Sequence, residues 1–121
     1  MKKILIVDDE ADIIEILQFM LETSGYECVT AMDGEEGLKL AREINPDLII
    51  LDVMMPKING YKICRLLKFD NKYKDIPIFM LTARSQDEDK LIGEETGADE
   101  YITKPFNVDE VVSTVKEYIG S

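Results

Sequence analysis

Long apolar stretches are missing from this sequence, and their absence limits the classes of protein that it can encode. No run among the 121 residues approaches the roughly 20 apolar residues that a membrane helix requires. The N-terminal segment MKKILIVDDE has two lysines and a short apolar run, but acidic residues follow where a signal peptide would have a longer core and a cleavage site. We therefore expect a cytoplasmic protein with no membrane partner, and we interpret this segment as a first strand.

Cysteine is scarce as well. Cys28 and Cys64 lie alone in apolar surroundings, and no CxxC spacing is present. This pattern favours reduced thiols in a core over a disulfide or a cysteine metal site.

Positive charge is in the minority, with 14 Lys and Arg residues against 25 Asp and Glu, a formal net charge of −11. Because affinity for nucleic-acid phosphates comes mostly from Lys and Arg, we expect no direct nucleic-acid binding by this domain. Two segments carry most of the charge asymmetry, and we interpret both as solvated helix faces. Residues 87–100 are acidic, and the cations gather at Lys57, Lys62, Arg65, Lys68, Lys72 and Lys74.

No linker, internal repeat or low-complexity stretch divides the chain, so residues 1–121 are predicted to form one domain with a single compact core. Short apolar runs bounded by turn residues predict five strands. These strands are expected at Lys3–Val7, Glu27–Ala31, 47–51, 76–81 and 98–102.

Helical patterns lie between the predicted strands. Residues 12–23 form an apolar helix that ends before Gly25 and has more apolar positions than one buried face requires. Three pairs have the spacing of a capping box, which predicts three further helix starts. The pairs are Asp33 with Glu36, Ser85 with Glu88, and Asn107 with Glu110, and the last helix has an apolar stripe at Val108, Val111, Val112, Val115 and Ile119.

No hairpin signal connects the strands, so strands and helices in alternation predict a doubly wound α/β fold with a parallel sheet. In such sheets, ligands bind outside the carboxyl ends of the strands. Polar residues that stand at these predicted ends are therefore the candidates for a site. They are Asp8 and Asp9 after strand one, Asp52 after strand three, Thr82 after strand four and Lys104 after strand five.

Asp8 and Asp9 admit two interpretations. One acid there would serve as a helix cap, since orphan N–H groups and the helix dipole favour a carboxylate. Two adjacent acids facing Asp52 would repel one another unless a cation or a proton neutralised them. A small set of hard oxygen ligands suits Mg²⁺, which keeps several waters and shares phosphate oxygens with the protein.

In combination, four segments resemble the response-regulator receiver domains of two-component signalling. The segments are ILIVDDE, PDLIILDVMMPKINGY, PIFMLTA and GADEYITKPF, and the resemblance extends over residues 3–119. It implies a flavodoxin-like fold with five helices and five strands in the order 2-1-3-4-5. It also implies that residues 1–121 are one receiver domain.

The resemblance implies a role for each candidate residue. Asp52 would accept the phosphoryl group, and Asp8, Asp9 and Asp52 would hold Mg²⁺ together with the backbone carbonyl of Met54. Thr82 and Lys104 would contact the phosphoryl oxygens. Tyr101 would be an aromatic switch coupled to Thr82, and the Lys104–Pro105 peptide would be cis. Asn59 departs from the family pattern, which commonly has Asp before Gly60, and little effect is expected beyond its loop.

The implied activity is signalling, not turnover of a metabolite. The donor would be a phosphohistidine on a histidine kinase or a histidine phosphotransfer protein, and the chain would catalyse only its own phosphorylation and dephosphorylation. Part of the set Ile13, Ile16, Phe19 and Met20 would meet the donor's helices. The output would be a surface formed by residues 86–96, strand five and residues 108–118, which acts on an effector, a fused output domain or a second copy.

Three other functions are alternatives to this interpretation, and two of them lack a residue pattern that they require. A magnesium-dependent phosphatase with an aspartyl nucleophile would need a carboxylate two residues after Asp52, where Met54 stands. A flavin or nucleotide carrier would need a phosphate loop rich in Gly, Ser or Thr after the first strand, and none is present. A receiver-like interaction module that is never phosphorylated would need none of the site residues.

Overall fold

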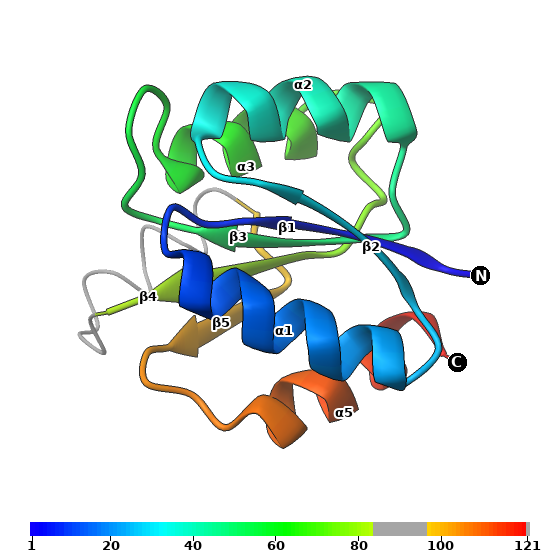
Figure 1. Ribbon diagram of the computed structural model, residues 1–121. Coiled ribbons are helices and arrows are strands. Elements are labelled where there is room, and N and C mark those ends of the chain that lie inside the picture. Colours follow the sequence, from blue (N-terminus) through cyan, green and yellow to red (C-terminus); the bar gives the residue numbers. More distant parts are fainter. Residues whose placement is uncertain (84–96, 121) are drawn as a thin grey trace.

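The computed structural model describes residues 1–83 and 97–120, which form one parallel five-stranded sheet with helices on both faces (Figure 1). The strand order is β2-β1-β3-β4-β5, as the family resemblance implied. The strands are β1 Lys3–Val7, β2 Glu27–Ala31, β3 Leu48–Asp52, β4 Ile78–Thr82 and β5 Glu100–Thr103. The helices are α1 Ala11–Thr23, α2 Gly34–Ile44, α3 Gly60–Lys68 and α5 Val108–Ile119. The helix predicted over residues 86–96, with its Ser85 cap, lies outside the described residues.

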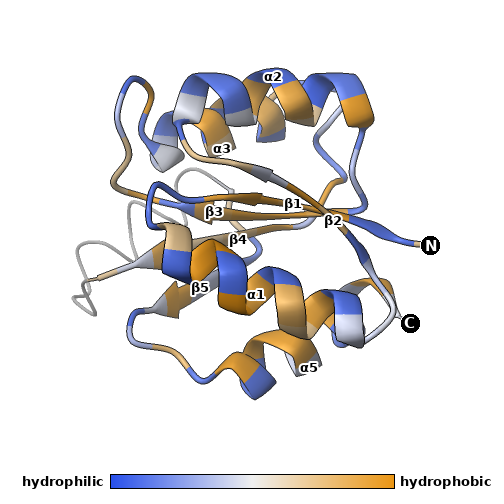
Figure 2. Ribbon diagram, in the orientation of Figure 1, coloured by the Kyte–Doolittle hydropathy of each residue, from blue (hydrophilic) through white to orange (hydrophobic). Residues whose placement is uncertain are grey.

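The two faces of the sheet build two separate cores, so the prediction of a single core is wrong: a sheet covered on both faces buries one set of side chains on each side. Helices α2 and α3 cover one face, and α1 and α5 cover the other (Figure 1). Alternate residues of β1 therefore enter different cores, with Leu5 and Val7 on the α2–α3 side and Ile4 and Ile6 on the α1–α5 side. Figure 2 shows the sheet as mostly hydrophobic and the outer surfaces of the helices as mixed.

Side-chain caps fix the starts of three helices. The Asp33 carboxylate accepts the N–H of Glu36 at 2.8 Å, and the Asn107 amide oxygen accepts the N–H of Glu110 at 3.3 Å, so both predicted caps are confirmed. Asn59 caps α3 by accepting the N–H of Lys62 at 3.0 Å, a role the sequence reasoning did not assign. Because Asn and Asp cap equally well, the departure from the family pattern at this position leaves the start of α3 intact.

Strands β3, β4 and β5 begin one or two residues later than predicted. Residue 77 is a proline without an N–H, and the N–H of Ile76 bonds to the carbonyl of Tyr73 in the preceding turn. The Asp99 carboxylate accepts the N–H of Ile78, the first residue of β4, at 2.8 Å. A side chain thus takes the place of the strand partner that a longer β4 would need at this end. Asp52 forms the last residue pair between β3 and β4, with Leu81. It is therefore the final residue of β3 itself, one position earlier relative to the strand end than predicted.

The surplus of apolar residues on α1 is confirmed. Ile14, Leu17 and Leu21 are buried, whereas Phe19 is 65% exposed and Ile16 is also exposed. Both cysteines are free, as predicted. Within residues 1–83 and 97–120, none of the helices combines the length and apolar character needed to cross a bilayer.

Candidate functional site

Four polar side chains meet at the carboxyl edge of the sheet. Asp8 follows β1, Asp52 ends β3, Thr82 ends β4 and Lys104 follows β5. Asp8, Asp52 and Thr82 are the buried polar side chains among the described residues, with 0%, 5% and 3% of their surface exposed. Parallel strands bring these residues together although they span 97 positions of the chain.

Lys104 joins the acidic residues into one charged cluster. Its ammonium lies 3.0 Å from an Asp8 oxygen, 3.3 Å from an Asp52 oxygen and 2.9 Å from a Glu10 oxygen. The cis peptide between Lys104 and Pro105 agrees with the family resemblance. One half-buried cation thus faces three carboxylates.

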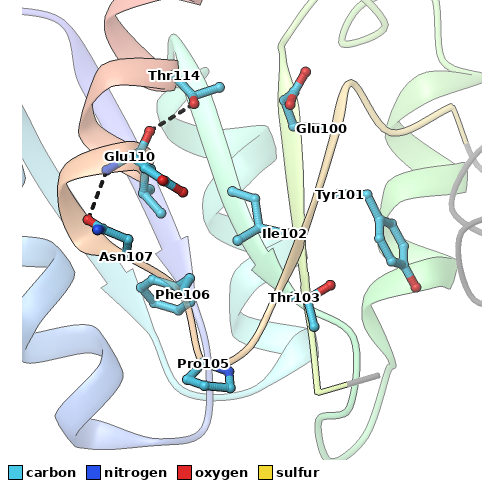
Figure 3. A pocket seen from close by; sticks show the side chains of 10 residues that line it. Glu100, Tyr101, Ile102, Thr103, Pro105, Phe106, Asn107, Glu110 and Thr114 are labelled. Carbon is cyan, nitrogen blue, oxygen red and sulfur yellow. Dashed lines mark hydrogen bonds between the residues drawn. The ribbon is translucent and has the colours of Figure 1, made fainter. Parts of the chain in front are cut away.

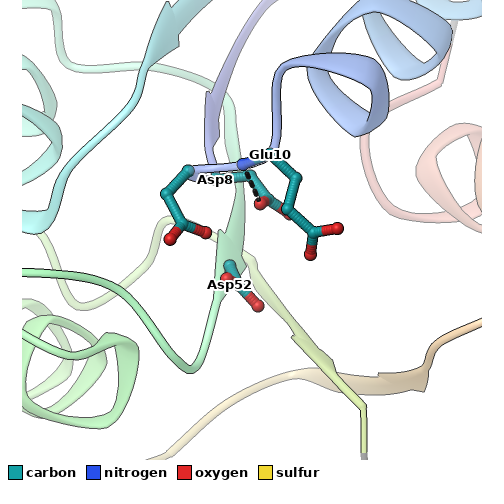
Figure 4. A group of neighbouring side chains, drawn as sticks. Asp8, Glu10 and Asp52 are labelled. Carbon is teal, nitrogen blue, oxygen red and sulfur yellow. Dashed lines mark hydrogen bonds between the residues drawn. The ribbon is translucent and has the colours of Figure 1, made fainter.

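The acidic cluster has the donors of a divalent-cation site. One carboxylate oxygen from each of Asp8, Asp9, Glu10 and Asp52 lies within 4.8 Å of the others. Figure 4 shows Asp8, Glu10 and Asp52 gathered where β1 and β3 end, with the Glu10 N–H donating to Asp8 at 2.9 Å. A group of hard oxygen donors with excess negative charge suits Mg²⁺ better than it suits a soft metal ion.

Glu10 is a site residue that the sequence reasoning missed. From the segment DDE, the predicted metal ligands include only the two aspartates, Asp8 and Asp9. The signal available was the third consecutive acid in DDE, at the turn from β1 into α1. Glu10 is also the N-cap residue of α1, yet its side chain makes no capping hydrogen bond and bonds to Lys104 instead.

Burial and mutual charge shift the pKa values of the side chains in this cluster. Burial, followed by the negative charge of Asp8, raises the pKa of Asp52 to about 6, against the lowering effect of Lys104. Burial likewise raises the pKa of Asp8. Burial by itself lowers the pKa of Lys104, but hydrogen bonds to Glu10 and Asp8 outweigh it and raise that pKa above its usual value. Lys104 therefore stays charged beside Asp8 and Asp52, whose ionised forms are disfavoured chiefly by burial.

Two glycines fix the loop that carries Met54. A Cβ on Gly60 would collide with the carbonyl oxygen of Asp52, and a Cβ on Gly34 would collide with the carbonyl oxygen of Ile58. The loop between β3 and α3 therefore packs its backbone against both neighbours. The Met54 side chain is exposed, which is compatible with the carbonyl role that the resemblance implies and does not test it.

The predicted switch residues lie on adjacent strands. Thr82 pairs with Thr103 in the sheet, and its carbonyl accepts the N–H of Lys104. The half-buried Tyr101 directs its ring toward α3, where its hydroxyl lies 3.1 Å from the hydroxyl of Tyr61. In Figure 3 this ring and the Phe106 ring lie on opposite sides of β5, and both residues line the pocket that is drawn there. Tyr101 thus contacts the α3 side of the sheet in this conformation.

Comparison with known proteins identifies close relatives of the whole chain. The family model described as response regulator receiver domain matches residues 4–116. The alkaline phosphatase synthesis transcriptional regulatory protein PhoP of Bacillus subtilis is 52% identical over 115 residues, 95% of this chain and 47% of PhoP. The DNA-binding dual master transcriptional regulator RpaA of Synechocystis is 45% identical over 96% of this chain and 48% of RpaA.

Among solved structures, the chemotaxis protein CheY4 of Vibrio cholerae matches with a TM-score of 0.90 and 36% identity over 98% of each chain. The match covers every strand of the sheet. The chain spans about half the length of the curated relatives it matches.

Proposed function

The chain belongs to the response regulator receiver domain family, and on this basis we propose that residues 1–121 form one receiver domain in which Asp52 accepts a phosphoryl group. The observation that carries the proposal is the convergence of buried Asp52 with Asp8 and Lys104 at one sheet edge. The donor would be a phosphohistidine of a histidine kinase or a histidine phosphotransfer protein. The chain would act on itself alone, so we do not class it as an enzyme.

Asp52 would act as the nucleophile. One of its oxygens forms a bond to phosphorus while the bond from phosphorus to the donor's imidazole nitrogen breaks, and the imidazole leaves. The transition state spreads negative charge over the equatorial oxygens, so a fixed cation beside Asp52 lowers its free energy. Lys104, already 3.3 Å from Asp52, supplies this charge, and the Thr82 hydroxyl would donate to a phosphoryl oxygen.

Mg²⁺ is the cofactor that the donor set fits. We assign Asp8, Asp9 and Asp52 and the Met54 carbonyl as its ligands, and Glu10 lies close enough to take part directly or through water. When bound, the ion would offset charge on the carboxylates and the phosphoryl group. Chelation by EDTA and the change Asp9→Ala are both expected to abolish labelling by acetyl phosphate, and labelling that survives EDTA would exclude the metal.

A phosphoryl group on Asp52 would change the positions of the Thr82 and Tyr101 side chains. The added charge and acceptor oxygens attract the Thr82 hydroxyl and Lys104, and movement of Thr82 leaves space that Tyr101 can fill. The changed surface would comprise β5 and α5 together with residues 86–96, which lie outside the described residues. Its target would be an effector, a fused output domain or a second copy, as in relatives named transcriptional regulators.

Helix α1 offers a docking face for the donor. Ile16 and Phe19 are exposed there, and Ile13 and Met20 are half-buried. Phe19→Lys is expected to abolish transfer from the kinase while labelling by acetyl phosphate persists. Phe69→Lys, an equally exposed position on the other face of the sheet, is the matched control.

Labelling tests the central proposal. Acetyl phosphate with Mg²⁺ is expected to add one phosphoryl group to the wild-type chain and none at that rate to Asp52→Asn, as measured by intact mass. Asp75→Asn, an exposed carboxylate away from the site, serves as the control. Equal labelling of wild type and Asp52→Asn would exclude Asp52 as the acceptor. If neither acetyl phosphate nor beryllofluoride modifies or perturbs the site, the chain is an unphosphorylated interaction module.

A further inference from the structure

Helix α3 carries a second stripe that faces away from the core. Its inner stripe, Ile63, Cys64 and Leu67, is buried in the core on the α2–α3 side. The outer stripe has the spacing i, i+3, i+4 and i+7, which places four side chains on one helix face and its extension. These side chains are Lys62, Arg65, Leu66 and Phe69, of which Leu66 is 39% exposed and Phe69 is 71% exposed.

This outer stripe lines one wall of a groove. Arg42, in the last turn of α2, lies on the opposite wall, and α2 and α3 run side by side in Figure 1. The groove has a cavity volume of about 860 Å³. Asp70 at its end accepts the N–H of Lys72 at 2.9 Å, so the adjacent turn uses that carboxylate. The lining of the groove thus combines the apolar side chains of Leu66 and Phe69 with three cations, Arg42, Lys62 and Arg65.

The charge of the groove is opposite to that of the chain. Six of the fourteen cations lie between residues 57 and 74, in a protein whose net charge is −11. The Arg65 guanidinium lies 5.7 Å from the centre of the Phe69 ring. Stacking occupies the face of a guanidinium and leaves its N–H groups able to bind a carboxylate. A ligand that pairs an apolar side chain with nearby carboxylates would therefore be complementary.

We propose that this groove, which we call the α2–α3 groove, binds an acidic amphipathic helix of another protein. An apolar side chain of that helix would rest on Leu66 and Phe69, and carboxylates along its two edges would pair with Arg42, Lys62 and Arg65. A groove between two helices is the surface into which amphipathic helices commonly dock. The groove shares no residue with the Asp52 site, so the proposal is independent of phosphorylation.

Two other anionic partners fit the groove less well. Nucleic acid presents a long row of phosphates, and a chain with net charge −11 repels such a polyanion outside the contact itself. An anionic membrane is a flat surface, which matches a hollow of about 860 Å³ less well than a helix does. A short acidic helix carries few charges and can place each of them against a cation.

The test uses isotope-labelled full chain and a synthetic 16-residue peptide, with a Leu and Phe stripe flanked by Glu on both edges. Amide resonances of Lys62, Arg65, Leu66 and Phe69 are expected to shift saturably, with a dissociation constant of roughly 10–100 µM. The same peptide with Lys in place of every Glu is expected to leave them unshifted. A 12-nucleotide single-stranded RNA and phosphatidylserine vesicles are titrated in parallel. Saturable shifts from either of these, without shifts from the acidic peptide, would overturn the proposal.

Matched variants separate specific contact from general charge. Arg65→Glu is expected to raise the dissociation constant of the peptide about 10-fold or more. Lys39→Glu, an exposed position on α2 with the same charge change, is expected to raise it less than about 2-fold. Phe69→Ala is expected to weaken it about 5-fold, whereas Phe19→Ala on the opposite face leaves it unchanged. Equal effects within either pair would mean that the peptide senses only net charge or nonspecific apolar surface, and the α2–α3 groove would not be its site.

Discussion

Replacing the candidate phosphoacceptor is expected to make the folded chain more stable. Asp52 is 5% exposed, and burial and the charge of Asp8 raise its pKa from 3.8 to about 6. The folded state therefore binds a proton more tightly at Asp52 than the unfolded chain does. The charged form costs stability, and Asp52→Asn removes that cost because an amide carries no charge at any pH.

The sign and the size of the effect follow from linkage. Between pH 4 and pH 6 the folded state holds more protons at Asp52, so its stability falls as the pH rises through this window. A pKa that moves from 3.8 to about 6 corresponds to about 3 kcal/mol, at about 1.4 kcal/mol per unit. Solvent at the rim of the site screens part of this charge, so we expect a gain of about 1–2 kcal/mol at pH 7.5.

Lys104 does not cancel the gain. In Asp52→Asn its ammonium keeps the carboxylates of Asp8 at 3.0 Å and Glu10 at 2.9 Å, which are closer than Asp52 at 3.3 Å. The amide oxygen of the new Asn can also accept a hydrogen bond from the ammonium. The substitution therefore removes charge repulsion without leaving the half-buried Lys104 ammonium unpaired.

Urea unfolding of wild type and Asp52→Asn at several pH values between 4 and 8, without divalent cations, measures the effect. The difference in unfolding free energy is expected to be near zero at pH 4 and to reach its plateau above pH 7. Mg²⁺ should reduce the difference by stabilising the wild-type chain, and Asp75→Asn should show no pH-dependent gain. A difference that is the same at pH 4 and pH 8, or a destabilised Asp52→Asn, would refute the reasoning.

Three further predictions concern single contacts of the site. Gly60→Ala is expected to cost about 2 kcal/mol or more in urea unfolding, because the new Cβ meets the Asp52 carbonyl; a neutral change would contradict this packing. Tyr61→Phe removes the hydroxyl that holds Tyr101, so labelling by acetyl phosphate should accelerate about 2–10-fold, and an unchanged rate would exclude coupling. Glu10→Gln should weaken Mg²⁺ binding several-fold in a calorimetric titration, and unchanged affinity would remove Glu10 from the site.

The fold was predictable because its signals are local and repeated. Apolar runs of strand length alternate with capped helices, and the caps at Asp33 and Asn107 lie where the sequence placed them. The exact strand ends were not predictable from apolar runs alone. They depend on contacts distant in sequence, such as the Asp99 carboxylate that binds the N–H of Ile78. Hydropathy cannot show which partner a terminal N–H will find.

The site was predictable only in part, for the same reason. Asp8, Asp52 and Lys104 could be assigned to one edge from topology, because each stands at the end of a predicted parallel strand. Glu10 could not, since an acid at the N-terminus of a helix is commonplace on dipole grounds alone. The hydrogen bond between Tyr61 and Tyr101 joins residues 40 positions apart, and although the resemblance singles out Tyr101, nothing in the sequence pairs it with Tyr61.

The charge imbalance at the sheet edge would couple the binding of a cation or a phosphoryl group to a rearrangement of the proposed switch. Three carboxylates share one ammonium, so a cation that binds among them, or a phosphoryl group that needs its own counter-charge, changes what Lys104 must neutralise. The N–H of Lys104 bonds to the carbonyl of Thr82, and β5 continues from there back to Tyr101 and its contact with Tyr61. Displacement of the ammonium would therefore act on a backbone that connects both candidate switch residues. We expect a change of charge at Asp52 to affect the α3 side of the sheet as well as the β5–α5 surface.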